Sequence, residues 1–145
     1  MIWLEPVGPD NWRLGLKVSE AQQRFVSSDM RLLARAYAYR EHGSRAFVVR
    51  DGEIPVGMAM YHDCAELGAY DFSQLFIDAR YQGQGFGRRA AQLVLEQMEA
   101  EGRFDKVVLC YIEGNDAARK LYSGLGFTHT GQQDEDEIIM ERTIR

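Results

Sequence analysis

A strand, a glycine-rich turn and a helix follow one another without interruption in the middle of this sequence. The apolar run LFI at residues 75–77 leads into RYQGQGFGRR at residues 80–89, and an amphipathic helix follows with an apolar face made by Ala91, Val94, Leu95 and Met98. Glycine allows the main chain to turn sharply and to approach a ligand closely. Because this turn precedes the positive end of a helix dipole, the unit predicts a binding site for an anion such as a phosphate group.

Two arginines, Arg88 and Arg89, lie in the first turn of that helix, where a positive side chain is unfavourable unless an anion is bound nearby. Two better-known glycine motifs do not fit the stretch. The third glycine of a GxGxxG dinucleotide fingerprint would fall on Arg88, and the chain has no GxxxxGK followed by Ser or Thr. The phosphate site is therefore expected to be neither a dinucleotide fingerprint nor a P-loop.

The composition predicts a single domain over residues 1–145. With 145 residues, 46% of them hydrophobic, the chain is long enough for one core and too short for two ordinary ones. Its 22 acidic and 17 basic residues give a net charge of −5, which argues against nucleic acid or an anionic membrane as a partner. A cationic substrate suits this charge better.

The two cysteines, Cys64 and Cys110, have no pairing pattern and no metal-ligand spacing, so we expect neither a disulfide framework nor a bound metal. The N-terminal residues lack the basic start and apolar run of a signal peptide, and no stretch approaches the roughly 18 apolar residues of a membrane span. These features predict a cytoplasmic protein.

The remaining segments predict an α+β fold with a mixed sheet. Strands are expected at residues 2–7, on both sides of the turn at Asp51 and Gly52, at 68–78, at 106–112 and in IIMERTI at 138–144. Helices are expected at 29–41 after a Ser27 or Ser28 cap, from the glycine turn to Gly102, and from an Asn115 cap to Gly126.

Three further segments carry weaker expectations. The continuous apolar run at 106–112 is typical of a strand buried on both faces. Residues 12–18 form an amphipathic stretch with Trp12, Leu14, Leu16 and Val18, and QQDEDE at 132–137 is expected to be an acidic turn.

Two separate motifs resemble the GCN5-related N-acetyltransferase (GNAT) superfamily. Gln82, Gly85 and Gly87 match its pattern (Gln/Arg)-x-x-Gly-x-(Gly/Ala), and EGNDAARKLYSGLGF at 113–127 is similar to its later segment with Asn, Tyr and a final GF. The resemblance implies a mostly antiparallel central sheet whose fourth and fifth strands splay apart. The pantetheine arm of acetyl-coenzyme A would enter between them, with its diphosphate on the glycine turn.

The resemblance also implies which residues contact this cosubstrate. The strand before the turn would offer main-chain groups, the turn its N–H groups and charge, and the later motif a contact to the pantetheine arm. The cofactor-binding set is Leu75, Phe76, Ile77, Gln82, Gly83, Gln84, Gly85, Phe86, Gly87, Arg88, Asn115 and Ala118. Without the resemblance, residues 75–77 would be interpreted as an ordinary buried strand with no binding role.

Tyr122 lies at the position of the family's usual general acid, seven residues after Asn115. A phenol, with a pKa of about 10, must be well placed to protonate a departing thiolate whose pKa is about 8.5. On the residues alone, Tyr122 is equally a core tyrosine beside Leu121 and Leu125.

The general base has three candidates in this sequence. Some relatives have a glutamate where this chain has Ser73, which cannot act as a base. Asp71 shares the face of Ser73 by the two-residue period of a strand and is the first candidate, with Glu66 and His62 as alternatives. All three are equally ordinary polar residues.

The segment at 18–39 resembles the N-terminal helices of bacterial spermine/spermidine-type acetyltransferases, although Asp29 replaces an asparagine. We therefore expect acetyl transfer from acetyl-CoA to a primary amine of a small cation, first of all a polyamine, by direct attack. The alternatives are another amine (an aminoglycoside, an amino acid or a protein N-terminus) and a non-catalytic acyl-CoA-binding or sensor module. The resemblance also makes a homodimer an expected assembly.

Overall fold

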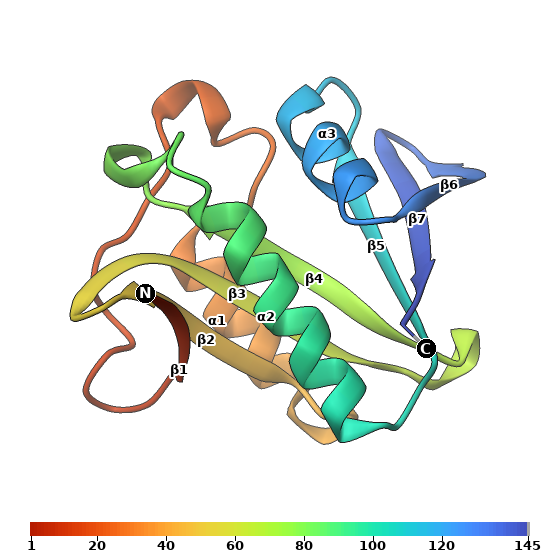
Figure 1. Cartoon of the computed structure of the whole chain (residues 1–145), viewed down its shortest axis with the longest axis horizontal. Coiled ribbons are helices and arrows are strands. Elements are labelled where there is room, and N and C mark those ends of the chain that lie inside the picture. The colour runs from red at the N-terminus through yellow and green to blue at the C-terminus, as the bar shows by residue number, and fades with distance from the viewer. Residues whose placement is uncertain (145) are drawn as a thin grey trace.

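A single mixed sheet of seven strands, in the order β1-β2-β3-β4-β5-β7-β6, forms the centre of the computed structural model, which describes residues 1–144 (Figure 1). The strands are β1 (Ile2–Pro6), β2 (Arg45–Asp51), β3 (Ile54–Cys64), β4 (Ala69–Ile77), β5 (Lys106–Ile112), β6 (Thr128–Asp134) and β7 (Glu137–Thr143). Within residues 1–144, β4 and β5 pair in parallel and all other neighbours pair antiparallel. The predicted fold class, mixed and mostly antiparallel, is confirmed.

Three helices cover the sheet: α1 (Asp29–Ala38), α2 (Phe86–Glu101) and α3 (Asp116–Gly124). Figure 1 shows α2 in front of the sheet and α1 behind it, with α3 beside β5. Short 3-10 turns add η1 (Glu20–Gln22), η2 (Arg40–His42), η3 (Ala65–Leu67) and η4 (Ala79–Tyr81).

The helix boundaries follow the predicted capping residues. Ser28 accepts a hydrogen bond from the N–H of Arg31 at the start of α1, and Asn115 caps α3 through the N–H of Ala118. Gly102 adopts the left-handed conformation at the end of α2, as glycine does at many helix ends.

Two sequence expectations were wrong in their detail. Residues 12–18 form neither a helix nor a strand: Leu16 is buried, but Trp12 and Leu14 are exposed. The segment is held instead by the buried Asp78 carboxylate, which accepts from the N–H of Lys17 at 3.0 Å. The acidic turn is shorter than expected, because β6 continues to Asp134 and leaves only residues 135–136 as the turn.

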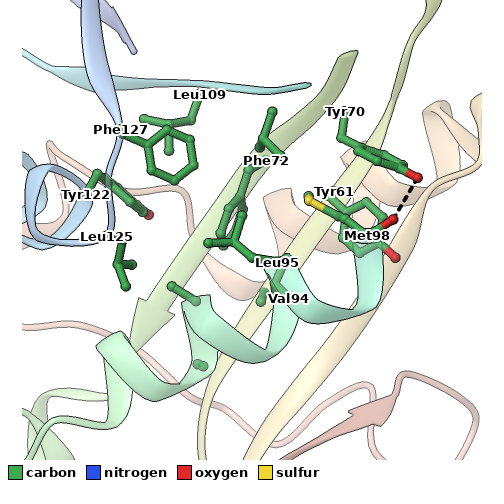
Figure 2. Packing of buried hydrophobic residues seen from close by; sticks show 14 of the residues in the cluster. Tyr61, Tyr70, Phe72, Val94, Leu95, Met98, Leu109, Tyr122, Leu125 and Phe127 are labelled. Carbon is green, nitrogen blue, oxygen red and sulfur yellow. Dashed lines mark hydrogen bonds between the residues drawn. The ribbon is translucent and has the colours of Figure 1, made fainter. Parts of the chain in front are cut away.

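The main hydrophobic core lies between the sheet and the helices α2 and α3. Figure 2 shows its two parts on either side of Phe72, which lies on β4. One part joins strand residues to α2 through Tyr61, Tyr70, Val94, Leu95 and Met98, and the other comprises Leu109, Tyr122, Leu125 and Phe127. A hydrogen bond of 2.9 Å from the Tyr70 hydroxyl to the Met98 carbonyl fixes the strand to the helix. A smaller core under α1 includes Leu32 and Met60.

A bulge in β4 separates its two ends. Met60 of β3 pairs with Gln74 and His62 pairs with Asp71, so β4 has one residue more than β3 across this interval. Such a bulge bends the strand and increases its twist. Within residues 1–144 the register of β4 with β5 contains only the pairs Tyr70–Val107 and Asp71–Val108. The two strands therefore part beyond the bulge, as predicted for the fourth and fifth strands.

Candidate functional site

A cavity of about 360 Å³ lies in the opening between β4 and β5. This volume is within the usual range for a site that binds a small molecule. Its walls come from the end of β4, the glycine turn, β5, the start of α3 and the N-terminal segment. Ten of the twelve residues predicted to bind the cofactor line it, and so does Tyr122 of the predicted catalytic set. The ten are Leu75, Phe76, Ile77, Gln82, Gly83, Gly85, Phe86, Gly87, Asn115 and Ala118.

The remaining two, Gln84 and Arg88, belong to the glycine turn and the first turn of α2 but do not line the cavity. Asp71 does not line it either, although its neighbour Ser73 does.

The glycine turn has a backbone shape that requires glycine at two positions. Gly83 and Gly85 have φ angles of 79° and 82°, which side chains other than glycine rarely adopt. An added Cβ at either position would meet no atom within 4 Å, so the space above both residues is open. Gly87 is different, because it is helical and its added Cβ would lie 3.6 Å from Ile77.

The main-chain N–H groups of residues 83–88 have no hydrogen-bond acceptor in the described part of the chain. The first N–H group in this region with an acceptor is that of Arg89, which donates to the Gly85 carbonyl at 3.1 Å. Free N–H groups at the start of a helix, with open space above them, are suited to a phosphate. The turn therefore fits the diphosphate of a coenzyme A thioester.

The side chains of Gln82 and Arg88 are directed elsewhere. Gln82 donates from Nε2 to the Ile77 carbonyl at 2.8 Å, which ties the turn to the end of β4. Arg88 donates from Nη2 to the carbonyl of Gly124, at the end of α3, at 3.3 Å. A helix C-terminus favours a cation, so this contact compensates Arg88 for its place in the first turn of α2.

An N-terminal strap, residues 17–26, forms part of the cavity wall. The resemblance of residues 18–39 implied that this region lies at the acceptor site, but the sequence did not predict its individual contacts. Gln22 and Phe25 line the cavity. Gln22 forms hydrogen bonds with Gln82 of the glycine turn. Phe25 lies close to Gly114, between β5 and α3: a Cβ added to Gly114 would be 3.8 Å from the Phe25 ring. The strap thus reaches both sides of the opening. No local pattern could have indicated these contacts, because the partners are far apart in sequence.

Tyr122 lies on α3 with its ring in the main core. The residue is 9% exposed, and its ring packs edge-on against Phe72 and Phe127 at centroid distances of 6.1 and 5.7 Å. Figure 2 shows its hydroxyl directed away from α3, toward Phe72. The hydroxyl has no hydrogen-bond partner among residues 1–144, and burial, with a smaller contribution from Cys110, raises the pKa of Tyr122 well above its ordinary value.

The three candidate bases are in different environments. Asp71 accepts a hydrogen bond from the Ser73 hydroxyl at 3.1 Å, and its other oxygen is 3.6 Å from Nε2 of His62. His62 is 3% exposed, with Nδ1 2.8 Å from the Asp63 carbonyl. Glu66 is exposed on η3 and does not line the cavity. Asp71 and His62 therefore lie together, and Glu66 is apart from them.

Cys110 shows that β5 is not buried on both faces, so that expectation was wrong at this position. Its neighbours on the strand are buried, but Cys110 is exposed and lines the cavity, because β4 has already diverged at this level. Its thiol donates to Glu137 at 3.6 Å. The pKa of the Cys110 thiol is raised to about 12. The main cause is that the walls of the cleft keep water from the sulfur, and the negative charges of Glu137 and Asp71 add to the effect.

Among residues 1–144, no group of three or more His, Cys, Asp and Glu side chains is arranged to hold a metal ion. In the same residues, no helix has both the length and the apolar character needed to cross a membrane.

Comparison with known proteins connects this geometry to a family. Residues 15–127 match the model of the Acetyltransferase (GNAT) family. The spermine/spermidine N(1)-acetyltransferase of Bacillus subtilis (strain 168) is 28% identical over 141 residues, which cover 90% of each chain.

Two solved structures share the fold. Spermidine N-acetyltransferase from Vibrio cholerae, in complex with CoA and spermine, has a TM-score of 0.79 at 20% identity and covers 98% of this chain and 95% of its own. A putative acetyltransferase of the GNAT family from Desulfovibrio desulfuricans has a TM-score of 0.79 at 18% identity over 100% of both chains.

Proposed function

This chain belongs to the acetyltransferase (GNAT) family, and from that premise we propose that it transfers an acetyl group from acetyl-CoA to a primary amine of a polyamine or a similar small cation. One observation carries the proposal: the free N–H groups of residues 83–88 and the side chain of Tyr122 belong to the same opening between β4 and β5. The N–H groups can hold a diphosphate, and the Tyr122 hydroxyl can reach a leaving thiolate.

The residues present fit acetyl-CoA, which supplies the acetyl group as a thioester. The amides of residues 83–88 would hold the diphosphate at the start of α2. Beyond the bulge, the main chain of Leu75, Phe76 and Ile77 has no partner on β5 within residues 1–144, and it lines the cavity. These residues pair with β3 on their other side, and the Ile77 carbonyl accepts from Gln82, so the main-chain groups directed to β5 are the ones available to the amide groups of a pantetheine arm.

Tyr122 is the proposed general acid. Its raised pKa keeps the phenol protonated at neutral pH, so a proton is available for the departing thiolate. No protein acceptor competes for that proton among residues 1–144. The ring contacts with Phe72 and Phe127 limit the directions in which the hydroxyl can point.

Asp71 is the proposed general base. A primary amine with a pKa of about 10.4 is almost entirely protonated at pH 7, so a group at the site must accept its proton before attack. Asp71 lies at the point where β4 and β5 part, with one carboxylate oxygen bonded to the cavity-lining Ser73. It can therefore receive the proton through an intervening hydroxyl or water.

The charge near the cavity supports a cationic acceptor. Glu137 lies beside Cys110, and the acidic turn between β6 and β7 continues from it. Residues 134–137 form no ion pair with any described residue, so their negative charge is available to a polycation. The Bacillus subtilis relative is named for spermine and spermidine, which agrees with this choice.

A thiol-release assay tests the proposal. Purified protein is mixed with acetyl-CoA and one of five acceptors: spermidine, spermine, an aminoglycoside, an α-amino acid or a peptide with a free N-terminus. We expect release of free CoA that depends on the amine and is fastest with a polyamine. Fastest release with a different acceptor would contradict the polyamine assignment, and tight binding of acetyl-CoA without release to any amine would indicate a sensor module.

The assembly and the compartment stay predictions. Light scattering of the purified protein checks the expected homodimer, and fractionation of the source cells checks the expected cytoplasmic location.

A further inference from the structure

A chain of three side chains connects α1 to the proposed base. Arg35 of α1 donates from Nε to the Ser73 hydroxyl at 3.2 Å, and the Ser73 hydroxyl donates to Oδ1 of Asp71 at 3.1 Å. Ser73 lies within the bulged interval of β4, and its hydrogen bonds to Asp71 and to Arg35 place it on the side of the sheet that faces α1. Of the three side chains, only that of Ser73 lines the cavity.

The direction of each hydrogen bond in this chain is fixed by chemistry. A guanidinium group can only donate, so the Ser73 oxygen must accept from Arg35. The single hydroxyl proton of Ser73 is then free to point to Asp71, because a carboxylate can only accept. Ser73 therefore presents a lone pair to the cavity and its proton to Asp71.

Two aromatic residues hold Arg35 in place. Its guanidinium lies over the Tyr39 ring at 4.8 Å, and Tyr39 stacks on His62 with centroids 4.0 Å apart. Nη2 of Arg35 is 3.5 Å from Nε2 of His62. Nδ1 of His62 faces the Asp63 carbonyl oxygen, which can only accept, so this contact fixes the ring with Nε2 toward Arg35.

We propose that Ser73 is a catalytic proton relay between the acceptor amine and Asp71, and that Arg35 is the residue that positions it. This inference rests on the proposed function, in which Asp71 is the base. As the amine gives a proton to the Ser73 oxygen, the hydroxyl proton of Ser73 passes to Oδ1 of Asp71. The hydroxyl is thereby regenerated, and the charge of the carboxylate is neutralised. Ser73 stands where some relatives have a glutamate. It thus lets Asp71, two residues earlier and outside the cavity wall, accept a proton from an amine in the cavity.

Substitutions at Ser73 test the relay. We expect Ser73→Ala to lower kcat by about 10- to 100-fold, in the range for loss of a proton-transfer group, without changing the Kd of acetyl-CoA. Ser73→Thr retains the hydroxyl and suits a strand, so it should restore most of kcat. If Ser73→Ala leaves kcat unchanged, or if Ser73→Thr is as impaired as Ser73→Ala, the relay is wrong.

A double-mutant cycle separates this inference from the proposed function. If Ser73 acts through Asp71, Ser73→Ala should change kcat by less than about 3-fold in an Asp71→Asn background, although each single substitution impairs kcat strongly. Full additivity would overturn the relay and leave Asp71 as the base. An unchanged kcat in Asp71→Asn alone would overturn the role of Asp71 itself, and the relay with it.

Arg35 has a matched control one turn earlier on α1. Arg31 is exposed, and its side chain forms no hydrogen bond, ion pair or cation–π contact with any described residue. We expect Arg35→Met to lower kcat several-fold, Arg35→Lys to recover part of the loss, and Arg31→Met to have no effect. Thermal unfolding of each variant checks that it is folded. Equal kcat values for Arg35→Met and Arg31→Met would overturn the positioning role.

Discussion

Gln22 and Gln82 bond to each other in both directions across 60 residues of sequence. Nε2 of Gln22 donates to Oε1 of Gln82 at 2.9 Å, and Nε2 of Gln82 donates to Oε1 of Gln22 at 3.0 Å. The same Nε2 of Gln82 also donates to the Ile77 carbonyl. This arrangement joins the N-terminal strap, the glycine turn and the end of β4 at one edge of the cavity.

The first prediction concerns this pair. Gln22→Ala removes both hydrogen bonds and loosens the strap, so we expect the Kd of acetyl-CoA to rise about 2- to 10-fold, in keeping with exposed hydrogen bonds of about 0.5–1.5 kcal/mol. Isothermal titration calorimetry measures this. Gln23→Ala is the control, because the Gln23 side chain is exposed and makes no hydrogen bond with residues 1–144. Equal Kd values for the two variants would contradict the role of the pair.

The second prediction concerns the shape of the glycine turn. Gly85→Ala forces alanine into a left-handed conformation, which costs about 1–2 kcal/mol and should weaken acetyl-CoA binding by about 5- to 30-fold. Gly87→Ala should weaken it far less, since Gly87 is helical and its added Cβ would make an ordinary contact with Ile77. Calorimetric titration of both variants with acetyl-CoA measures the two Kd values. A larger loss of affinity in Gly87→Ala than in Gly85→Ala would show that the positive φ angle of the turn does not determine acetyl-CoA binding.

A third prediction follows from the environment of Tyr122. Tyr122→Phe retains the ring contacts with Phe72 and Phe127 but removes the hydroxyl, so kcat should fall about 100-fold while the Kd of acetyl-CoA changes little. Steady-state kinetics with spermidine measure the change. Tyr37→Phe, at a residue that is 67% exposed, is the control. An unaltered kcat in Tyr122→Phe would remove Tyr122 from the mechanism.

The fourth prediction is a pH dependence of stability at Asp78. The Arg80 side chain, and then the N–H groups of Lys17 and Arg80, lower the pKa of Asp78 from 3.8 to about 2. Because the folded pKa is the lower one, this carboxylate stabilises the protein above about pH 4, and the effect is lost as the pH falls through about 2.

Asp78→Asn should therefore lower the free energy of unfolding at pH 7 by about 1–2 kcal/mol, a value kept small because Arg80 is mostly exposed. The difference from the natural sequence should shrink between pH 4 and pH 2. Urea denaturation at several pH values measures it, with Asp10→Asn at an exposed position as the control. A difference that stays constant over this range would contradict the assigned cause.

The parts of the fold that short stretches of sequence control were predictable. Gly102 ends α2, and Asn115 begins α3, because glycine and asparagine satisfy local backbone requirements at helix ends. Gly83 and Gly85 likewise have the positive φ angles that a sharp turn requires. The sequence therefore predicted the glycine turn together with the strand and the helix on either side of it.

The contacts that complete the site depend on pairing between distant segments. The exposure of Cys110 follows from the divergence of β4, which no pattern within residues 106–112 contains. The bulge in β4 appears only in its register with β3. Arg35 and Gln22 were missed for the same reason, since each acts through a partner at least 38 residues away.

The most direct measurement is a crystal structure with coenzyme A bound. The account predicts the diphosphate within hydrogen-bond distance of the N–H groups of residues 83–88, the pantetheine arm between β4 and β5, and the thiol beside Tyr122. A coenzyme A molecule bound elsewhere, with those N–H groups making no contact to its phosphates, would contradict the account.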